Sequence, residues 1–286
     1  MSAIRNYYRL TKPGIVYGNA FTTLAAFLYA SRWHGSLALF FATLIGIGLV
    51  VASACVFNNV LDRGIDERMA RTKERPLVTG AIRVPAALAY GAVLGILGLA
   101  LLYIYANPLT AALALFGHLS YVLVYGWAKR ASPWGTVVGS VPGAIPIVVG
   151  YTAVTGRLDV VALLLFLILV LWQMPHFYAI AMYRLDDYVA AGIPVLPARS
   201  GMRATKAHLL CYIIAYLVAV SAFMVLGHAG WAYLVIALGT GLAWAWRALA
   251  GWKAPDDARW AKGVFFYSLI VLVAFSLALA FAPLLP

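Results

Sequence analysis

The chain has 286 residues, of which 64% are hydrophobic and 10% are charged, and its formal net charge is +12. A soluble domain carries roughly 25% charged residues, and a disordered chain carries few apolar ones, so the composition excludes both classes. Because the basic residues lie between apolar segments, their excess indicates membrane topology and contact with the lipid bilayer, and not nucleic-acid binding. The composition predicts an all-α integral membrane protein.

Nine apolar segments approach or exceed the length of about 20 residues that a bilayer-spanning helix needs. In chain order they cover residues 14–30, 36–57, 85–106, 109–127, 134–154, 160–181, 207–226, 231–250 and 263–283. We therefore expect a bundle of nine transmembrane helices around a central cavity, with residues 1–286 forming a single domain. The first segment follows a basic stretch that lacks a clear signal-peptide cleavage site, so we interpret it as a retained helix.

The distribution of charge supports this layout. The N-terminus and the linkers after the even-numbered segments together carry 19 Lys and Arg residues, whereas the opposite side carries only Arg32 and Arg157. An excess of Lys and Arg marks the cytoplasmic side, so the N-terminus is predicted to be cytoplasmic and the C-terminus to lie outside. Eight of the nine acidic residues share the cytoplasmic side, which the topology rule does not require and which indicates a site there.

The most informative polar residues follow the second segment. Asn58, Asp62 and Asp66 are spaced four residues apart, so they share one face of a helix that begins near membrane depth. Carboxylates in such a place are costly and usually mark an ion or substrate site. Two carboxylates and an amide oxygen suit Mg²⁺, which completes its coordination shell with water and phosphate.

Cations lie directly downstream of these acids, at Arg68, Arg71, Lys73 and Arg75. Metal ligands followed by cations suit a Mg²⁺–diphosphate group, because Arg and Lys neutralise the charge that the metal leaves. The spacing alone is equally consistent with a solvated helix end that carries ordinary salt bridges.

At this point the sequence resembles a known family, the UbiA-type intramembrane prenyltransferases. The pattern N-x-x-x-D-x-x-x-D after the second span carries the resemblance, together with the segments TKPGIVYGN, VASACVFNNVLDRGID, MARTKERPL, WQMPHFYAIAMYR and AGIPVLPARSG. Within the family, the chain is most similar to the branch that farnesylates haem. The resemblance implies transfer of the farnesyl group of farnesyl diphosphate to a vinyl group of haem B, with addition of water, giving haem O and diphosphate.

The resemblance also implies roles for individual residues. Asn58, Asp62 and Asp66 would hold Mg²⁺, and Asp62 and Asp66 would be catalytic. The second family signature, Y-x-x-x-K, matches Tyr125 and Lys129, where Lys129 would stabilise the leaving diphosphate and Tyr125 would donate a hydrogen bond. Further diphosphate-binding residues would be Asn58, Arg71, Lys73, Arg75, Arg130 and Arg184. Without the resemblance, Lys129 and Arg130 would be interpreted as ordinary cytoplasmic anchors.

One departure from the family pattern follows the sixth segment. Many relatives carry a second D-x-x-x-D there, whereas this chain has adjacent acids at Asp186 and Asp187. Adjacent residues cannot present two carboxylates on one helical face. The departure leaves the number of Mg²⁺ ions open, and it leaves Arg184 to contact either diphosphate or a haem propionate.

Two histidines lie within apolar segments. His176 follows Pro175, which can open the helix hydrogen-bond ladder and form a pocket, and neutral imidazole is a common ligand of haem iron. With the resemblance, haem binding by His176 and simple packing of its ring are equally supported. His118 has no comparable motif around it, so we interpret it as a core residue and a reserve ligand.

Two other functions remain open from the residues. A relative that prenylates a quinone precursor or chlorophyllide is the nearest alternative, and a transporter or non-enzymatic haem chaperone is the alternative outside enzymes, since intramembrane acids also build ion pathways. The absence of an Arg- and Ser-rich transit segment favours a bacterial inner membrane. The resemblance implies haem A synthase or a terminal oxidase as a partner.

Overall fold

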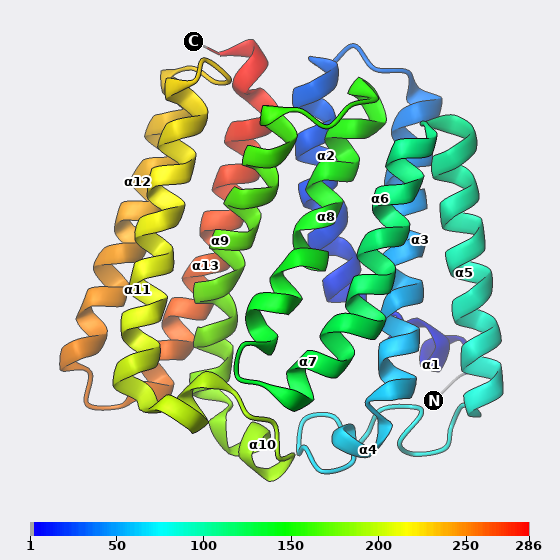
Figure 1. The fold of residues 1–286 in the computed structure, drawn as a ribbon, viewed down its shortest axis with the longest axis vertical. Helices are drawn as coiled ribbons and strands as arrows, with labels where there is room; N and C mark the ends of the chain where they lie inside the picture. Colours follow the sequence, from blue (N-terminus) through cyan, green and yellow to red (C-terminus); the bar gives the residue numbers. More distant parts are fainter. Residues whose placement is uncertain (1–2, 286) are drawn as a thin grey trace.

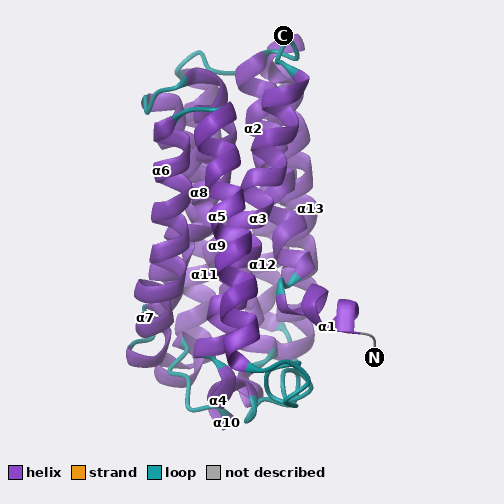
Figure 2. Cartoon of the chain, turned by 90° about the vertical axis from the view of Figure 1, so that its right-hand side faces the viewer, coloured by secondary structure: helices purple, strands orange, loops and turns teal. Residues whose placement is uncertain are grey.

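The computed structural model describes residues 3–285, and within that range the regular structure is entirely helical. The long helices stand side by side as an upright bundle (Figure 1). Loops and short helices gather at the two ends of the bundle (Figure 2). The longer helices are α2 (Pro13–Ser31), α3 (Leu37–Leu61), α5 (Val84–Tyr105), α6 (Pro108–Leu119), α8 (Gly135–Thr155), α9 (Val160–Tyr183), α11 (Leu196–Val225), α12 (Trp231–Leu249) and α13 (Asp257–Phe281).

Short helices complete the chain. They are α1 (Ala3–Leu10), α4 (Arg63–Asp66), the π-helical turn η1 (Ser120–Tyr125), α7 (Gly126–Ala131), α10 (Leu185–Ala190) and the 3₁₀ turns η2 (Ala250–Lys253) and η3 (Ala282–Leu284). Helices α6, η1 and α7 run on without a break as one span, Pro108–Ala131. Each of the nine predicted segments therefore corresponds to a long helical span in the described part of the chain.

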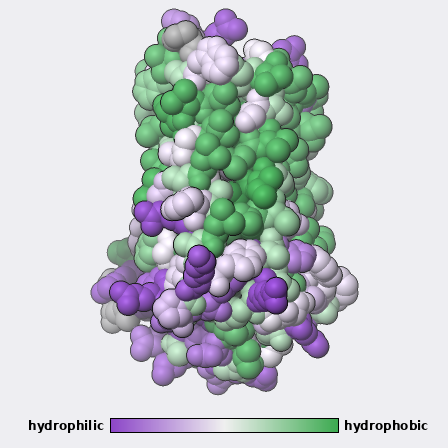
Figure 3. All heavy atoms as spheres, turned by 90° about the vertical axis from the view of Figure 1, so that its left-hand side faces the viewer, coloured by the Kyte–Doolittle hydropathy of each residue, from purple (hydrophilic) through white to green (hydrophobic). Residues whose placement is uncertain are grey.

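Eight of these spans are long and apolar enough to cross a membrane, within residues 3–285. The exception is α2, whose 19 residues include the polar side chains Asn19, Thr22 and Thr23. These side chains bond to backbone carbonyls, as when the Thr23 hydroxyl donates to the Pro146 carbonyl at 2.9 Å. Apolar side chains cover much of the bundle's outer surface, and hydrophilic residues gather at one end (Figure 3). The protein is an integral, multi-pass membrane protein.

Small residues allow the helices to approach closely, as is typical of membrane bundles. A Cβ atom added at Gly98 of α5 would lie 2.6 Å from the Gly46 carbonyl oxygen of α3. A Cβ added at Gly150 of α8 would lie 2.2 Å from the Thr23 carbonyl oxygen of α2. Close backbone contact at these points joins α5 to α3 and α2 to α8, and α8 also packs on α9.

The polar linkers of the chain meet at one end of the bundle. Helices α4, α7 and α10 and the N-terminal end of the described chain lie there, whereas its C-terminal end lies at the other (Figure 1). An odd number of membrane crossings requires the two ends of the chain to lie at opposite ends of the bundle. The fold thus brings the linkers after α3, α7 and α9 together at this end of the bundle, around the entrance to a cavity.

Candidate active site

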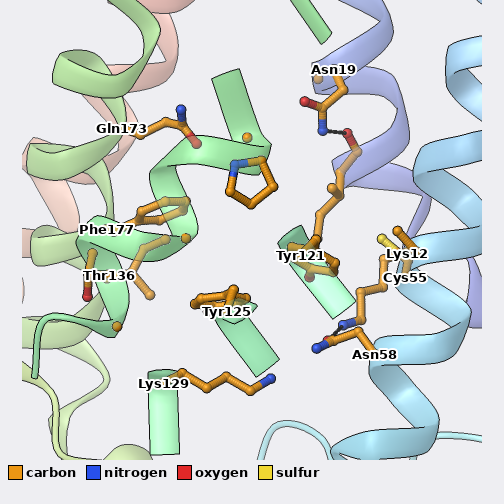
Figure 4. A pocket seen from close by; sticks show the side chains of 18 of the residues that line it. Lys12, Asn19, Cys55, Asn58, Tyr121, Tyr125, Lys129, Thr136, Gln173 and Phe177 are labelled. Atoms are coloured by element: carbon orange, nitrogen blue, oxygen red, sulfur yellow. Dashed lines mark hydrogen bonds between the residues drawn. The ribbon is translucent and has the colours of Figure 1, made fainter. Parts of the chain in front are cut away.

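A cavity of about 520 Å³ lies at this entrance and extends into the bundle. Its walls come from α2, α3, the α6–η1–α7 span, α8 and α9, with Leu269 and Leu272 contributed by α13. Charged residues occupy the outer end, and aromatic and aliphatic side chains line the interior, as Figure 4 shows for Lys129, Tyr125 and Phe177. The volume is typical of small-molecule sites, which span roughly 300–1,000 Å³.

Asn58, Asp62 and Asp66 all line this cavity and are buried, with 2%, 7% and 4% of their surfaces exposed. Helix α3 ends at Leu61, but hydrogen bonds from Asp62 N to Asn58 O (2.9 Å) and from Asp66 N to Asp62 O (2.8 Å) continue the helical path into α4. The four-residue spacing therefore places all three side chains on the cavity side.

Each of these side chains is paired with a cation. Lys129 and Arg130 both bond to Asp62, with Arg130 at 3.1 Å. Arg75 donates to Asp66 at 2.6 Å and to the Asn59 amide oxygen at 3.1 Å. The cations reach the acids from the loop after α4 and from α7, so the acids are not an ordinary solvated helix end. They form the centre of a buried charged cluster.

Lys12 completes the cluster, although no sequence pattern had singled it out. Its ammonium donates to the Asn58 amide oxygen at 2.7 Å (Figure 4). The residue lies between α1 and α2 with φ of 51°, a left-handed conformation that costs a non-glycine residue about 1–3 kcal/mol. Burial lowers the pKa of the Lys12 amine to about 8, and the charges of Arg75 and Lys129 add to this effect.

Lys12 was missed because a cation just before a first apolar segment is expected from topology alone. Its only distinguishing signal in the sequence was its place in the segment TKPGIVYGN, where Pro13 occupies the first turn of α2. Asn59 was missed for a different reason. It is the neighbour of Asn58, yet its amide is also buried, bonding Arg75 and the Leu10 carbonyl.

Tyr125 and Lys129 adjoin the acids on the opposite wall. The Lys129 ammonium lies 5.2 Å from the centre of the Tyr125 ring, which stacks on Tyr121 at 5.4 Å. Both tyrosines belong to the π-helical turn η1, a departure from α-helix that is frequent at functional sites. Gly139 of α8 leaves room for the ring, since a Cβ there would lie 2.7 Å from it. Tyr125 thus presents its ring face to the Lys129 ammonium, and the hydrogen bond predicted for its hydroxyl stays a prediction.

The remaining predicted diphosphate-binding residues are placed differently. Arg71 lines the cavity, as does Tyr188 of α10. Arg130 lies outside the lining but contacts Asp62 directly. Lys73 is exposed and also lies outside the lining. Arg184 lies outside the lining: it pairs with Asp187 at 3.9 Å and packs on the Tyr183 ring.

His176 lines the deeper part of the cavity. Its ring stacks on Trp172 at 4.9 Å and lies 4.9 Å from Phe265, and its Nδ1 is bonded to the Ser268 hydroxyl at 2.7 Å. His118 lines the same cavity from α6 and is bonded through Nε2 to Ser53 at 3.0 Å. The structure therefore brings both intramembrane histidines to the site.

The donor set fits a magnesium ion that shares its shell with phosphate. No group of three or more His, Cys, Asp or Glu side chains within residues 3–285 forms a metal site by itself. Asp62, Asp66 and the Asn58 amide supply three hard oxygen-bearing groups, and Mg²⁺ typically uses one or two carboxylates with water and substrate phosphate. The Asn58 amide nitrogen is buried without a hydrogen-bond partner, as expected of a polar group that lacks its ligand environment.

Comparisons with known proteins identify the family to which the chain belongs. Residues 19–270 match the UbiA prenyltransferase family. The chain is 47% identical to "Protoheme IX farnesyltransferase 2" of Pseudomonas fluorescens, over 97% of this chain and 95% of that protein. Among solved structures, it matches a digeranylgeranylglyceryl phosphate synthase with TM-score 0.81, 18% identity and 99% coverage of both chains.

A second structural match is a UbiA homologue from Archaeoglobus fulgidus bound to GPP and Mg²⁺. Its TM-score is 0.67 with 16% identity, and the match covers 96% of this chain and 99% of that one. These two structural likenesses bear on the fold alone, whereas the family model covers most of the sequence. The chain belongs to the UbiA prenyltransferase family.

Proposed function

We propose that this protein transfers the farnesyl group of farnesyl diphosphate to a vinyl group of haem B, with addition of water, giving haem O and diphosphate. The observation that carries the proposal is the buried cluster of acids and cations at the mouth of an apolar cavity that contains His176. The name of the relative that is 47% identical, a protohaem IX farnesyltransferase, supports the choice of substrates.

Asn58, Asp62 and Asp66 would hold Mg²⁺ together with the diphosphate. The Archaeoglobus fulgidus homologue binds GPP and Mg²⁺, which supports a metal requirement here. When bound, the metal would neutralise charge on the diphosphate as the leaving group forms. Asp62 and Asp66 would hold the metal in a defined place, because each carboxylate is buried and bonded to a cation.

The cations of the cluster bind the diphosphate and stabilise its departure. Lys12, Arg71, Arg75 and Lys129 all line the cavity and outnumber the two aspartates there. This excess of positive charge favours a polyanion, and the attraction strengthens as charge develops on the leaving oxygen. The allylic carbon–oxygen bond breaks with its electron pair on the diphosphate, and the vinyl group of haem forms a new bond to the allylic carbon.

The apolar part of the cavity has two tasks. It accommodates the farnesyl chain, and it limits the access of water until the carbon–carbon bond has formed. A cation then remains on the porphyrin side chain, where water adds through its oxygen and releases a proton to solvent. The ring faces of Tyr121 and Tyr125, stacked beside Lys129, offer further stabilisation to nearby positive charge.

His176 would bind the haem iron and so hold the porphyrin within the cavity. The entrance lies at the end of the bundle that carries most Lys and Arg residues, so we place it on the cytoplasmic side of a bacterial inner membrane, with the C-terminus outside. In that setting, haem A synthase or a terminal oxidase would receive the product.

The experiment that tests this function uses the purified protein in lipid with haem B, farnesyl diphosphate and Mg²⁺. Mass spectrometry of the extracted haem should show a product heavier by a farnesyl group and a hydroxyl group, and chelation of Mg²⁺ should abolish it. Unchanged haem from folded protein would contradict the proposal. Release of diphosphate with a quinone precursor or chlorophyllide would instead identify the other prenyl acceptor.

A further inference from the structure

Ser268 of α13 makes three hydrogen bonds around His176. The Ser268 hydroxyl lies 2.7 Å from His176 Nδ1, and the same hydroxyl donates to the Phe265 carbonyl at 2.5 Å. The Ser268 backbone carbonyl accepts from Trp172 Nε1 at 2.9 Å. Ser268 is completely buried, so no solvent competes for these bonds.

This arrangement determines which nitrogen of His176 carries the proton. A serine hydroxyl has one hydrogen, and here the Phe265 carbonyl accepts it. The Ser268 oxygen can therefore only accept from Nδ1, so His176 is the tautomer protonated at Nδ1. Its Nε2 keeps a lone pair, and this atom makes no hydrogen bond to the described residues. A neutral imidazole in this tautomer is suited to ligate a metal through Nε2.

The orientation of the ring is fixed as well. Trp172 stacks on one side of the His176 ring, and Phe265 packs against it from α13. Since Ser268 bonds both Trp172 and His176, one residue holds the ligand candidate and its stacking partner on the cavity wall. Fixing the ring in this way removes the rotational freedom that haem binding would otherwise have to restrict.

His118 provides an internal contrast. The Ser53 hydroxyl donates to the Gly91 carbonyl at 2.7 Å and so accepts from His118 Nε2 at 3.0 Å. The same reasoning leaves the lone pair on Nδ1, but His118 Nδ1 is buried without a partner, enclosed by protein. The ring nitrogen that could bind a metal is therefore closed off in His118 and available in His176.

We propose that Ser268 is a positioning residue that holds His176 in the Nδ1-protonated tautomer, so that Nε2 ligates the iron of haem, and that His118 has a structural role. This inference rests on the proposed function, because it requires haem to enter the cavity. An imidazole ligand that donates its other N–H to an acceptor is more basic and fixed in orientation, and loss of such a partner typically weakens metal binding about 10–100-fold.

The test uses the purified full-length protein titrated with ferric haem B and then reduced with dithionite. Absorption spectroscopy gives the haem affinity, and resonance Raman spectroscopy gives the iron–histidine stretching frequency. In the Ser268→Ala variant we expect haem affinity to fall about tenfold and the stretching frequency to decrease. Ser268→Thr, which keeps the hydroxyl, should restore the stretching frequency of the unmodified protein.

Ser276→Ala is the matched control. Ser276 lies on the same helix, is 1% exposed, and its hydroxyl has no hydrogen-bond partner. We expect it to leave both readouts unchanged, because it removes a buried serine hydroxyl without touching His176. Loss of folding by a general effect on α13 would therefore be visible in the control.

Three outcomes separate this inference from the proposed function. An unmodified protein that binds no haem would overturn both. An iron–histidine stretching frequency that is the same in Ser268→Ala and in the unmodified protein would overturn the role of Ser268 alone. An iron–histidine stretching band that is lost in His118→Ala and kept in His176→Ala would overturn the assignment of His176 as the iron ligand. The proposal of farnesyl transfer would remain.

Discussion

The two sides of the entrance differ, although each follows a long helix and each carries two aspartates. On the α3–α4 side, Asp62 and Asp66 are buried and bonded to cations from distant segments. On the α9–α10 side, Asp186 is exposed and Asp187 pairs only with Arg184, three residues away, among the described residues. Spacing by four residues turns two carboxylates inward, whereas adjacency cannot. The difference predicts that only the first side carries the metal and the diphosphate.

The largest expected effect is that of Asp62→Asn. Removing one charge from the buried centre should lower the rate of haem O formation by about 100–1,000-fold, since it removes electrostatic stabilisation of the leaving group. Product formation is measured by mass spectrometry of extracted haem. The retained haem spectrum serves as a check on folding, because the variant also leaves Lys129 without its carboxylate partner. Turnover near that of the unmodified protein would exclude the metal-binding role.

Lys12→Met should have the next largest effect. The buried ammonium bonds Asn58 at the inner edge of the cluster, and a hydrogen bond to a charged group contributes about 1.5–3 kcal/mol. We therefore expect kcat/KM for farnesyl diphosphate to fall by at least about tenfold, chiefly through KM. Lys262→Met, an exposed lysine of α13, is the control. Equal kinetics in the two variants would place Lys12 outside the substrate site.

Gly139→Ala tests whether turnover depends on the position of the Tyr125 ring. The added Cβ would lie 2.7 Å from the Tyr125 ring, so the ring must shift, and its contact with Lys129 changes. Overpacking of this kind costs about 1–3 kcal/mol, and we expect a lower melting temperature together with reduced turnover. Gly263→Ala has open space around its Cβ and should change neither quantity. Unaltered turnover in Gly139→Ala would show that the Tyr125 ring does not contribute to the reaction.

The smallest effect is expected for Asp187→Asn, on the other side of the entrance. Its pairing with Arg184 is long and partly exposed, and such pairs contribute about 0–1 kcal/mol. Haem O formation should stay within about twofold of the unmodified protein. A loss as large as that of Asp62→Asn would show that both sides bind metal, and the proposed asymmetry would be wrong.

Much of the bundle was predictable because hydrophobic length and charge bias act locally. All nine predicted segments became helical spans, and most boundaries differ by only a few residues. The largest difference is at α11, which begins at Leu196 and not near residue 207: it consists of two helical stretches that meet at a kink, where the backbone of Gly201 is not helical. The polar residues before position 207 interrupt the hydrophobic pattern, so the sequence did not indicate a helix there.

The site was predictable in part. Asn58, Asp62 and Asp66 share the cavity side because their spacing matches the helical period. Lys12 and Asn59 could not be found in that way, since no local pattern distinguishes a buried cation or amide from an ordinary one. The sequence leaves Arg184 to contact either diphosphate or a haem propionate, and the structure places it outside the cavity lining, paired with Asp187. These outcomes depend on which elements pack together.

The sequence by itself determined the class of protein, the number of long helices and the segment that carries the acids. These features follow from the periodicity of side chains and from the cost of placing charge in a bilayer, which are properties of neighbouring residues. Only the tertiary structure decided that Lys12, Arg75 and Lys129 meet around those acids, and that Ser268 reaches His176 across 92 positions of chain. Contacts between distant segments depend on helix packing, which no local pattern encodes.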